Sequence, residues 1–450
     1  MTTRRHFLKT SASAVAAGLI IPSSFGHGIS PARVNSISPA RVIGANDRIN
    51  VGLIGCKNMG WADLGDFLLN PNVECTAICD IDKDILDNRA IELQQTKNKR
   101  PEIFGDYRKM LELKDLDIVI IGTPDHWHCL QFVDACAAGK DVYVEKPIAN
   151  YISECDIMVK AAKRYERVTT VGQQQRSGDH WKNMIDYINS GKLGTISRVD
   201  VWANFSYGAL SRPVPDSEVP QGVDFNTWLG PAKLRPFNQK RFHGSWRMFW
   251  DYGGGLMTDW GVHLLDMALW GMNVDYLPKR IVAVGGKYAY PENCPETFDT
   301  QNVTYEFDSF IMNWSHTSIE SGIYNRNYGV AFKGTNGTLV ANREGWEILP
   351  EWDSQSNKGK IESLKEYPSN NDHKKHVDSF LDCVKSRSFN TPCTIENGSL
   401  CAKYAHLGNI AARTRSVLQY DNDKQKFIGN KDADLLLKPA YRSPWKLPSV

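Results

Sequence analysis

The sequence lacks the features that mark several classes of protein. Its 53 basic and 51 acidic residues leave a formal charge of +2 at pH 7, and it has no long basic run, so the charge pattern of a nucleic-acid-binding protein is missing. It has no short-period repeat of the kind that solenoids and propellers show. Beyond the first few dozen residues, no apolar run is long enough to span a membrane. We expect a globular protein that, once the N-terminal segment is removed, neither spans a membrane nor binds nucleic acid, and whose partner is a small, weakly charged molecule.

The sequence also lacks a thiol or metal motif. Its ten cysteines form no Cys-x-x-Cys pair, and we interpret them mainly as small core residues. A disulfide between Cys383 and Cys393, or between Cys393 and Cys401, stays open in an oxidising compartment. His126 and His128 stand two residues apart, a spacing that does not place them on one helix face, and no carboxylate cluster completes a site. The sequence predicts no metal.

The N-terminus has the pattern of an export signal. A basic and apolar run stands directly before a stretch of small residues over 10–22, and it reads Arg4-Arg5-His6-Phe7-Leu8-Lys9. This order is typical of a twin-arginine signal. We predict a signal peptide over 1–30, a linker over 31–48 and a periplasmic location.

The remaining length is too great for one compact core and divides into two domains and a tail. Over 49–172, short apolar strands alternate with helical patterns, which predicts βαβ units and a doubly wound parallel sheet. Over 173–420, long alternating strands and turns predict an α+β domain, with Asn336-Gly337 as a hairpin signal. We expect the last segment, 421–450, to pack back on the body as a tail.

The first predicted βα turn reads Gly55-Cys56-Lys57-Asn58-Met59-Gly60. It fits a dinucleotide-binding turn at its first and third glycines but has Lys57 where the middle glycine is expected. Lys57 must turn its side chain away or contact phosphate itself. Asp80 ends the second predicted strand 20 residues beyond Gly60, where a carboxylate accepts the ribose hydroxyls and repels a 2′-phosphate, so the pattern favours NAD over NADP.

Two further predicted strands end at the same edge of the sheet as the glycine turn and Asp80, where doubly wound sheets bind ligands. A predicted strand over 116–122 ends in Thr123-Pro124-Asp125-His126-Trp127-His128, and we expect the histidines to pack beside the nicotinamide or its ribose. The next strand ends in Val144-Glu145-Lys146-Pro147. Because proline restricts the residue before it to extended geometry, the ammonium of Lys146 can be aimed at a bound hydroxyl, which makes it a candidate catalytic group.

The second half supplies a candidate acid and base. A helix is predicted over the segment that contains Asp259, His263 and Asp266, and the first two, four residues apart, would share a helix face. A carboxylate beside an imidazole orients the ring and favours its protonated form, while the imidazole exchanges a proton near neutral pH. A buried structural histidine is the alternative interpretation.

An aromatic segment precedes this helix. Trp246 and Trp250 stand beside Arg247 and Asp251, a combination that resembles a sugar site, in which ring faces cover C–H surface and polar groups bind hydroxyls. The same rings could instead form core between the domains.

Taken together, these motifs resemble the glucose-fructose oxidoreductase, inositol dehydrogenase and rhizopine-catabolism (Gfo/Idh/MocA) family. Glu145-Lys146-Pro147 combined with Asp259-x-x-x-His263 is the specific part of the match, which runs from about residue 49 to the C-terminal region. The resemblance implies a Rossmann domain joined to an α+β domain with a large open, mostly antiparallel sheet that often mediates assembly, here as a dimer or tetramer. It also implies that Lys146 holds the reacting hydroxyl, that His263 is the acid/base and that Asp259 is its partner.

Two sets of site residues follow from the motifs and the resemblance. Contacts to the cofactor, NAD or alternatively NADP, are predicted for Gly55, Cys56, Lys57, Asn58, Met59, Gly60, Asp80, Thr123, Pro124, Asp125, His128, Glu145, Lys146 and Gln175. Contacts to the substrate are predicted for Lys146, Arg176, Trp246, Arg247, Trp250, Asp251, Asp259 and His263.

The predicted function is a dehydrogenase of a sugar, glycoside or polyol. Because an exported enzyme meets little free dinucleotide, we hypothesise a tightly held cofactor in a closed redox cycle. Two alternatives stay open: a glycoside-processing enzyme that uses transient oxidation and elimination, and a sugar-binding protein that has kept the fold without catalysis.

Overall fold

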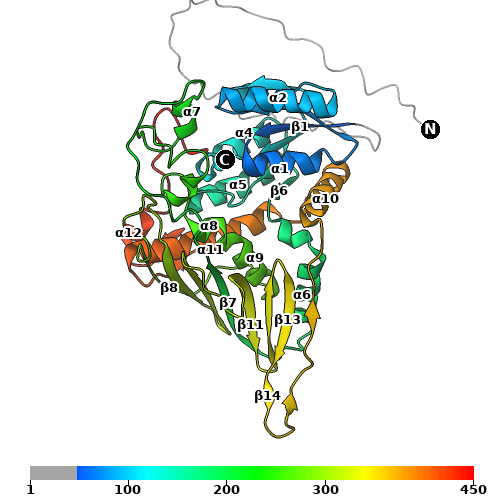
Figure 1. Ribbon diagram of the computed structural model, residues 1–450, viewed down its shortest axis with the longest axis vertical. Helices are drawn as coiled ribbons and strands as arrows, with labels where there is room; N and C mark the ends of the chain where they lie inside the picture. The colour runs from blue at the N-terminus through cyan, green and yellow to red at the C-terminus, as the bar shows by residue number, and fades with distance from the viewer. Residues whose placement is uncertain (1–47) are drawn as a thin grey trace, which may run out of the picture. The chain divides into compact units, whose positions relative to one another are not determined.

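The computed structural model describes residues 48–450, and the predicted signal peptide and linker lie outside that range apart from residue 48. The described residues begin with a six-stranded parallel sheet in the order β3-β2-β1-β4-β5-β6, and β1 and β6 of this sheet are labelled in the upper part of Figure 1. Its strands are β1 Ile49–Ile54, β2 Val73–Cys79, β3 Glu102–Phe104, β4 Ile118–Ile121, β5 Asp141–Val144 and β6 Thr169–Val171. The order turns outward from β1 and β4, which is the doubly wound arrangement that the sequence predicts.

Apolar side chains on both faces explain why this sheet is buried. Along β4, Ile118 and Ile120 join one core cluster, while Val119 and Ile121 join another on the opposite face, as the twofold repeat of a strand requires. The connecting helices are α1 Asn58–Phe67, α2 Lys83–Lys97, α3 Tyr107–Met110, α4 Asp125–Ala137 and α5 Ile152–Tyr165.

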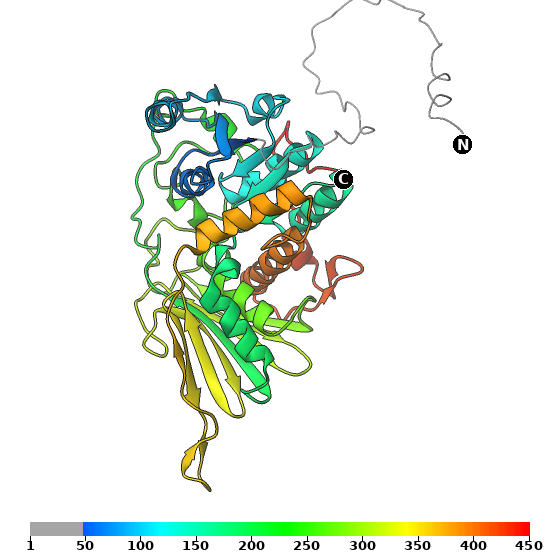
Figure 2. The ribbon, with the colours of Figure 1, turned by 90° about the vertical axis from the view of Figure 1, so that its right-hand side faces the viewer.

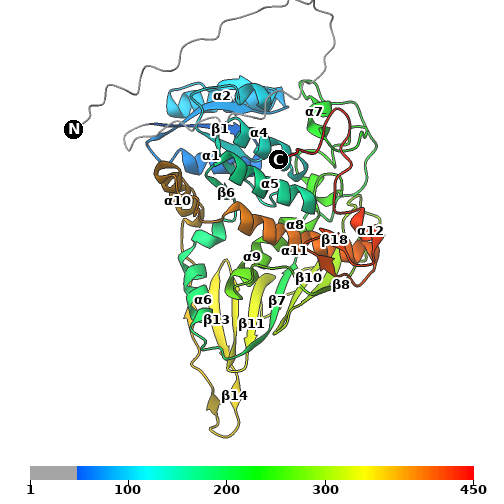
Figure 3. The same ribbon diagram turned by 180° about the vertical axis from the view of Figure 1, so that it is seen from behind.

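Two helices from the end of the chain complete the first domain. α10 Asp372–Ser386 packs against α1, and α11 Ile395–Thr414 contacts α5 on one side and α9 Gly261–Gly271 on the other (Figure 3). Val377, Phe380 and Leu381 of α10 belong to the same core cluster as β1. The two halves of the chain therefore share one body rather than meeting only at a linker.

The second half is built on an eight-stranded sheet in the order β16-β13-β12-β11-β7-β10-β9-β8. Only β7 and β10 pair in parallel, and the remaining neighbours are antiparallel. The strands are β7 Ile196–Asn204, β8 Arg280–Gly286, β9 Thr300–Glu306, β10 Ile311–Thr317, β11 Tyr328–Gly334, β12 Gly337–Asn342, β13 Gly345–Pro350 and β16 Lys365–Glu366. The Asn336-Gly337 hairpin is confirmed between β11 and β12.

Helices cover one face of this sheet, as Figure 2 shows. α6 Asp179–Asn189 and α9 pack there through one large apolar cluster. The predicted fold class, a Rossmann domain followed by a domain with a mostly antiparallel sheet, is confirmed.

The remaining helices and strands of the described chain are short. The helices are η1 Gln174–Ser177, α7 Phe225–Leu229, η2 Ser245–Met248, α8 Leu256–Asp259 and α12 Lys431–Asp434, and the two-residue strands are β14 Trp352–Asp353, β15 Lys358–Gly359, β17 Tyr420–Asp421 and β18 Lys426–Phe427. After α12 the tail returns to the first domain, where the rings of Trp445 and Trp127 meet edge to face with their centres 4.8 Å apart.

One local prediction is wrong. Asp259 and His263 do not share a continuous helix, because α8 ends at Asp259 and α9 begins at Gly261, with Trp260 between them.

All ten cysteines are free thiols, so neither of the two disulfides left open by the sequence is formed here. Within residues 48–450, no helix is long and apolar enough to cross a membrane, and no group of three or more His, Cys, Asp or Glu side chains is arranged to hold a metal ion.

Candidate active site

The backbone of the turn between β1 and α1 requires glycine at two positions but not at a third. Gly55 has φ +90°, and a Cβ there would lie 2.9 Å from the carbonyl carbon of Gly122. A Cβ on Gly60 would lie 2.3 Å from Gly55 O. Lys57, by contrast, has φ −122° and ψ 160°, an extended backbone that any residue adopts. The departure from the usual glycine pattern is therefore compatible with the same chain path.

The N-terminus of α1 is open to a ligand. Lys57 is its N-cap residue and makes no capping hydrogen bond through its side chain. The first N–H groups of a helix have no partner within the helix and carry partial positive charge, which is how such turns hold a pyrophosphate. The exposed ammonium of Lys57 can add a full positive charge at the same place.

Asp80 stands at the end of β2, where the sequence predicts a ribose contact. Its Oδ2 accepts the Cys56 N–H at 2.7 Å and its Oδ1 accepts the Asp82 N–H at 3.1 Å. Burial raises the pKa of this carboxyl, while the two N–H groups favour its charged form. A carboxylate has about four acceptor positions, so ribose hydroxyls can bind beside these backbone donors.

These residues open onto one cavity of about 640 Å³, called the main cavity below. Seven of the predicted cofactor residues line it: Gly55, Lys57, Asn58, Met59, Asp80, Thr123 and Pro124. Its other walls come from distant parts of the chain, including Arg108, Trp127, Thr227, Trp228, His243, Trp246, Arg247 and Trp445. The size, the uncapped helix end and the placed carboxylate fit a dinucleotide.

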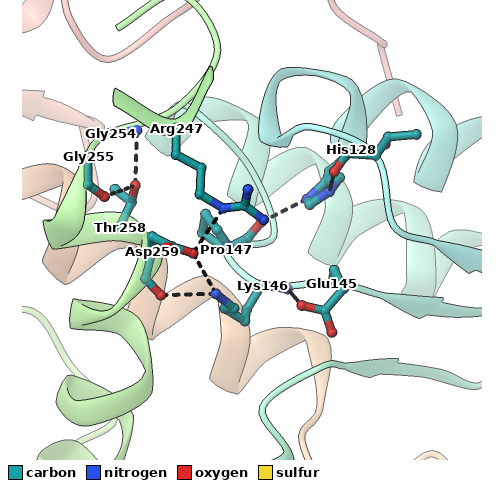
Figure 4. A network of polar contacts seen from close by, with 10 residues as sticks. His128, Glu145, Lys146, Pro147, Arg247, Gly254, Gly255, Thr258 and Asp259 are labelled. Atoms are coloured by element: carbon teal, nitrogen blue, oxygen red, sulfur yellow. Dashed lines mark hydrogen bonds and ion pairs between the residues drawn. The ribbon is translucent and has the colours of Figure 1, made fainter. Parts of the chain in front are cut away.

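Next to this cavity, three charged side chains converge on the end of β5 (Figure 4). Lys146 Nζ donates to Asp259 Oδ1 at 2.7 Å and to Asp259 O at 3.1 Å. Arg247 Nε donates to the same Oδ1 at 3.2 Å. Although burial opposes ionisation, the two cations lower the pKa of Asp259 to about 2. The structure thus brings two predicted catalytic residues into direct contact and adds Arg247 as a second cation.

His263 lies beside this pair but in a different state from the one predicted. Burial and the positive charge of Lys146 lower its pKa well below the ordinary value, so the ring is neutral. Its Nδ1 is buried without a hydrogen-bond partner, and within residues 48–450 no hydrogen bond joins the ring to Asp259. The prediction that Asp259 orients the imidazole and favours its protonated form is wrong, because the carboxylate of Asp259 pairs with Lys146 and Arg247 instead.

Neighbouring carboxyl groups add little negative charge. Burial raises the pKa of Asp125 well above its usual value, although Arg247 opposes the shift. Burial and the nearby Asp63 raise the pKa of Glu145 to about 8.

His128 contacts two backbone oxygens, with Nδ1 2.8 Å from Pro147 O and Nε2 2.8 Å from Thr123 O. It therefore braces the turns after β4 and β5 and does not line the main cavity.

Several predicted substrate residues lie elsewhere. Arg176 makes a two-pronged ion pair with Asp266, with Nη2 2.7 Å from Oδ1 and Nε 2.8 Å from Oδ2. Trp250 donates through Nε1 to Glu296 O at 3.1 Å, and Asp251 faces Arg235 at 3.3 Å. Among the predicted aromatic residues, Trp246 does line the main cavity, with the guanidinium of Arg247 4.2 Å from its ring centre.

Sequence reasoning missed residues that reach the site only through folding. The hydroxyl of Tyr207 helps to lower the pKa of Asp259, and Arg343 lies close enough to lower the pKa of His263. Trp445 lines the main cavity almost 400 positions after Gly55. No local pattern marks these three, since each sits in a turn or loop whose partner is distant in the sequence.

Two family models match the chain over nearly all of its described length. One is the NAD-binding Rossmann fold of an oxidoreductase family over residues 49–173, and the other is the C-terminal alpha/beta domain of that family over residues 188–447. The chain belongs to the Gfo/Idh/MocA oxidoreductase family. Its first domain is an NAD-binding domain, which agrees with the cavity and the turn described above.

The curated relatives include proteins named for glycoside hydrolysis. The chain is 31% identical over 202 residues to a glycosyl hydrolase family 109 protein of Shewanella putrefaciens. It is 29% identical over 206 residues to an alpha-N-acetylgalactosaminidase of Shewanella oneidensis. Each match covers 43% of this chain and 44% of the relative, so the aligned part spans less than half the length of either protein.

Solved structures with the same fold include sugar dehydrogenases. The WlbA dehydrogenase of Bordetella pertussis, in complex with NADH and UDP-GlcNAcA, has a TM-score of 0.61 at 18% identity, covering 83% of this chain and 99% of that one. A levoglucosan dehydrogenase in complex with NADH and levoglucosan has a TM-score of 0.62 at 19% identity, with the same coverage. At this identity the likeness shows the fold alone.

Proposed function

We propose that this protein is an NAD-dependent enzyme that transfers a hydride between the nicotinamide and a hydroxyl-bearing carbon of a sugar, glycoside or polyol. One observation carries the proposal. The ammonium of Lys146 is fixed 2.7 Å from Asp259 at the end of β5, beside a neutral His263 and next to the dinucleotide-sized main cavity, whose wall includes Arg247.

Oxidation of an alcohol needs a group that binds its oxygen and a base that accepts its proton, and different side chains fill these two roles. NAD, held in the main cavity, would supply the acceptor for the hydride of the alcohol carbon. Lys146 donates a hydrogen bond to the substrate oxygen and stabilises the negative charge that develops on it. Neutral His263 accepts the hydroxyl proton, leaving a carbonyl group. Asp259 and the carbonyl oxygen of the same residue hold the ammonium in place.

We further propose that the enzyme is exported by the twin-arginine route and keeps its cofactor through many turnovers. One feature of the chain and one consequence of the proposed export support a retained cofactor. The main cavity is walled by both halves of the chain and by Trp445 of the tail, and an exported enzyme could not readily replace a released NADH. The reaction then closes when a second carbonyl substrate, or the same one at a later step, takes the hydride back.

The test is to release and identify nucleotide from purified, denatured protein by absorbance and mass spectrometry. The native protein is then screened against sugars, glycosides and polyols at the NADH absorbance band. We expect bound NAD that one substrate class reduces, and a His263→Ala variant in which the reduction rate falls about 100-fold or more. Protein that carries no nucleotide, and shows no reduction with added NAD, contradicts the proposal and favours a sugar-binding protein.

A second candidate function has its own support. The curated relatives named above are glycosidases by name, and oxidation of a sugar carbon acidifies its neighbour, which permits elimination of an aglycone. The same screen separates the two functions when glycosides are included. Release of free aglycone without net NADH favours glycoside processing, whereas accumulation of a carbonyl product and NADH favours the dehydrogenase.

A further inference from the structure

Arg343 is an unassigned cation at the edge of the candidate active site. It lies in the turn between β12 and β13, and its guanidinium stands 4.8 Å from the ring centre of Trp260. Its Nε donates to Gln175 Oε1 at 3.1 Å. One face and one N–H of the side chain are thereby occupied, while no residue of 48–450 makes a hydrogen bond or an ion pair with the two terminal amino groups.

The contacts of Gln175 and Trp260 connect Arg343 to the reacting groups. Gln175 Nε2 donates to His263 O at 3.2 Å, so this amide bridges the histidine backbone and the guanidinium. The Trp260 ring lies edge-on to His263, with the ring centres 6.2 Å apart. Arg343 also contributes positive charge that lowers the pKa of His263. The guanidinium is therefore a neighbour of the proposed reaction centre.

No carboxylate of residues 48–450 forms an ion pair with Arg343. Two other arginines with little exposure do have such partners, since Arg176 pairs with Asp266 and Arg326 pairs with Glu347. Burial lowers the pKa of Arg343, and the more distant carboxylates of Asp259 and Asp372 only partly oppose the shift, which is the cost of holding a cation away from water without a direct ion pair. The side chain is thus placed at an energetic disadvantage that an anionic ligand would remove.

The charges of the whole site point the same way. Lys146, Arg247 and Arg343 share the carboxylate of Asp259, and the carboxylate of Asp372 also acts on Arg343 without forming an ion pair with it. Burial raises the pKa of Asp125 well above its usual value, so this carboxyl adds little negative charge and the three cations outnumber the two carboxylates. An unpaired polar atom also lies beside the cations. Within residues 48–450, His263 Nδ1 has no hydrogen-bond partner, and the residue is only 5% exposed.

We propose that the substrate carries an anionic group, a carboxylate or a phosphate, on a carbon near the reacting hydroxyl, and that Arg343 binds this group. The inference rests on the proposed function, because it names the class of sugar that the enzyme uses. A guanidinium presents paired N–H donors that match the oxygens of either anion. The overall charge balance of the sequence predicts a weakly charged partner, but the local excess at the site decides which ligand fits.

The experiment compares matched acidic and neutral sugars on the purified protein with its cofactor. The panel contains glucuronate, galacturonate and gluconate as carboxylates, glucose 6-phosphate and galactose 6-phosphate as phosphates, and glucose, galactose and inositol as neutral compounds. Binding is measured by calorimetry and turnover by NADH absorbance. The calorimetric readout makes the result independent of turnover, so failure of this inference and failure of the proposed function can be told apart.

Three variants assign the effect to one side chain. Arg343→Gln removes the charge, Arg343→Lys keeps the charge without the paired donors, and Arg280→Gln removes the same charge at a site where the arginine pairs with Glu306 on the second sheet. For the preferred acidic sugar, we expect Arg343→Gln to raise KM about 30-fold or more while kcat changes less than about threefold, as loss of ground-state binding requires. Arg343→Lys should recover part of that loss, and Arg280→Gln should match the unaltered protein.

The outcomes divide clearly. Tighter binding of either the carboxylates or the phosphates than of the neutral sugars, lost in Arg343→Gln, supports the inference and identifies which anion is recognised. Equal binding of neutral and acidic sugars, or an Arg343→Gln variant that keeps its preference, overturns it even when a neutral sugar reduces the cofactor. Acidic sugars that bind without any reduction support the anion site and contradict the proposed function.

Discussion

At the scale of single residues, Asp259 is the carboxylate that pairs with both Lys146 and Arg247. Oδ1 accepts hydrogen bonds from both Lys146 and Arg247, and the side chain is almost fully buried. Breaking such a pair from one side leaves charges that are neither hydrated nor neutralised. The contacts therefore give Asp259 the role of positioning the cations, and the proposed mechanism assigns proton transfer to His263.

Replacing Asp259 by asparagine tests this role. We expect Asp259→Asn to lower the free energy of unfolding at pH 7 by about 3–5 kcal/mol, measured by urea denaturation, and to slow reduction of the bound cofactor. Because the folded pKa of about 2 lies below the usual value of 3.8, the pair stabilises the protein above about pH 4. The difference between the proteins should shrink as the pH falls from about 4 toward 2.

An exposed pair provides the comparison. Asp308 pairs with Lys279 on the surface, where both side chains are largely exposed, and Asp308→Asn should change the free energy of unfolding by less than about 0.5–1 kcal/mol. An Asp259→Asn protein as stable as Asp308→Asn would contradict the importance given to the buried pair.

At the scale of elements, the β1–α1 turn shows which parts of a motif are required by backbone geometry. Gly55 is required by its positive φ and Gly60 by the close approach of α1 to the turn. Lys57 occupies a position that needs neither. A deviation at the middle position therefore changes the charge beside the pyrophosphate site without changing the path of the chain.

Two glycines of the same helix make a matched test of this reasoning. A Cβ on Gly60 meets Gly55 O at 2.3 Å, whereas a Cβ on Gly65 has nothing within 4 Å. We expect Gly60→Ala to push α1 away from the turn, at a cost of about 1–3 kcal/mol, and to weaken NAD binding about tenfold or more. Gly65→Ala should keep NAD binding and raise stability slightly, because alanine favours a helix by about 1 kcal/mol over glycine.

The measurement is the amount of nucleotide that co-purifies with each variant, together with its melting temperature. A Gly60→Ala protein that retains the full amount of nucleotide would show that the close contact between α1 and the turn is not needed for the cofactor.

At the scale of the whole molecule, the main cavity is closed by parts of the chain that are far apart in the sequence. Trp445 of the tail meets Trp127 edge to face, with the ring centres 4.8 Å apart, and lies beneath the guanidinium of Arg108 at 5.4 Å. Arg442 fastens the tail through hydrogen bonds to Gly230 O and to Asn226. The tail thus acts as one wall of the proposed cofactor site.

Removing this wall should speed the loss of nucleotide. We expect Trp445→Ala to raise the rate of NAD dissociation about tenfold, which corresponds to about 1.4 kcal/mol of lost contact energy, with little change in the rate of hydride transfer itself. Exchange of bound NAD for an isotopically labelled form measures this rate. Tyr367→Ala removes an aromatic ring that is 71% exposed and does not line the cavity, and it should exchange at the original rate.

A Trp445→Ala protein with unchanged exchange would mean that other residues retain the nucleotide. Exchange within the time of one turnover in the unaltered protein would contradict the closed redox cycle.

The sequence by itself determined the fold class, the edge of the sheet at which the site forms, and the presence there of Gly55, Asp80 and Lys146. Strand and helix periodicity, and the residues next to a proline or in a glycine turn, act over a few positions, so they can be read locally. The predicted contact between Asp259 and His263 failed for the same reason: spacing along the chain does not show that two cations from other segments reach the carboxylate first.

Only the tertiary structure decided the partners of Asp259, the placement of Arg343 beside His263, and the closure of the main cavity by Trp445. Lys146 meets Asp259 across 113 positions of sequence, and Arg343 meets Gln175 across 168. Such pairs form because two sheets, a returning helix and a tail bury their apolar faces together, and this packing brings distant charges into a region where water is excluded.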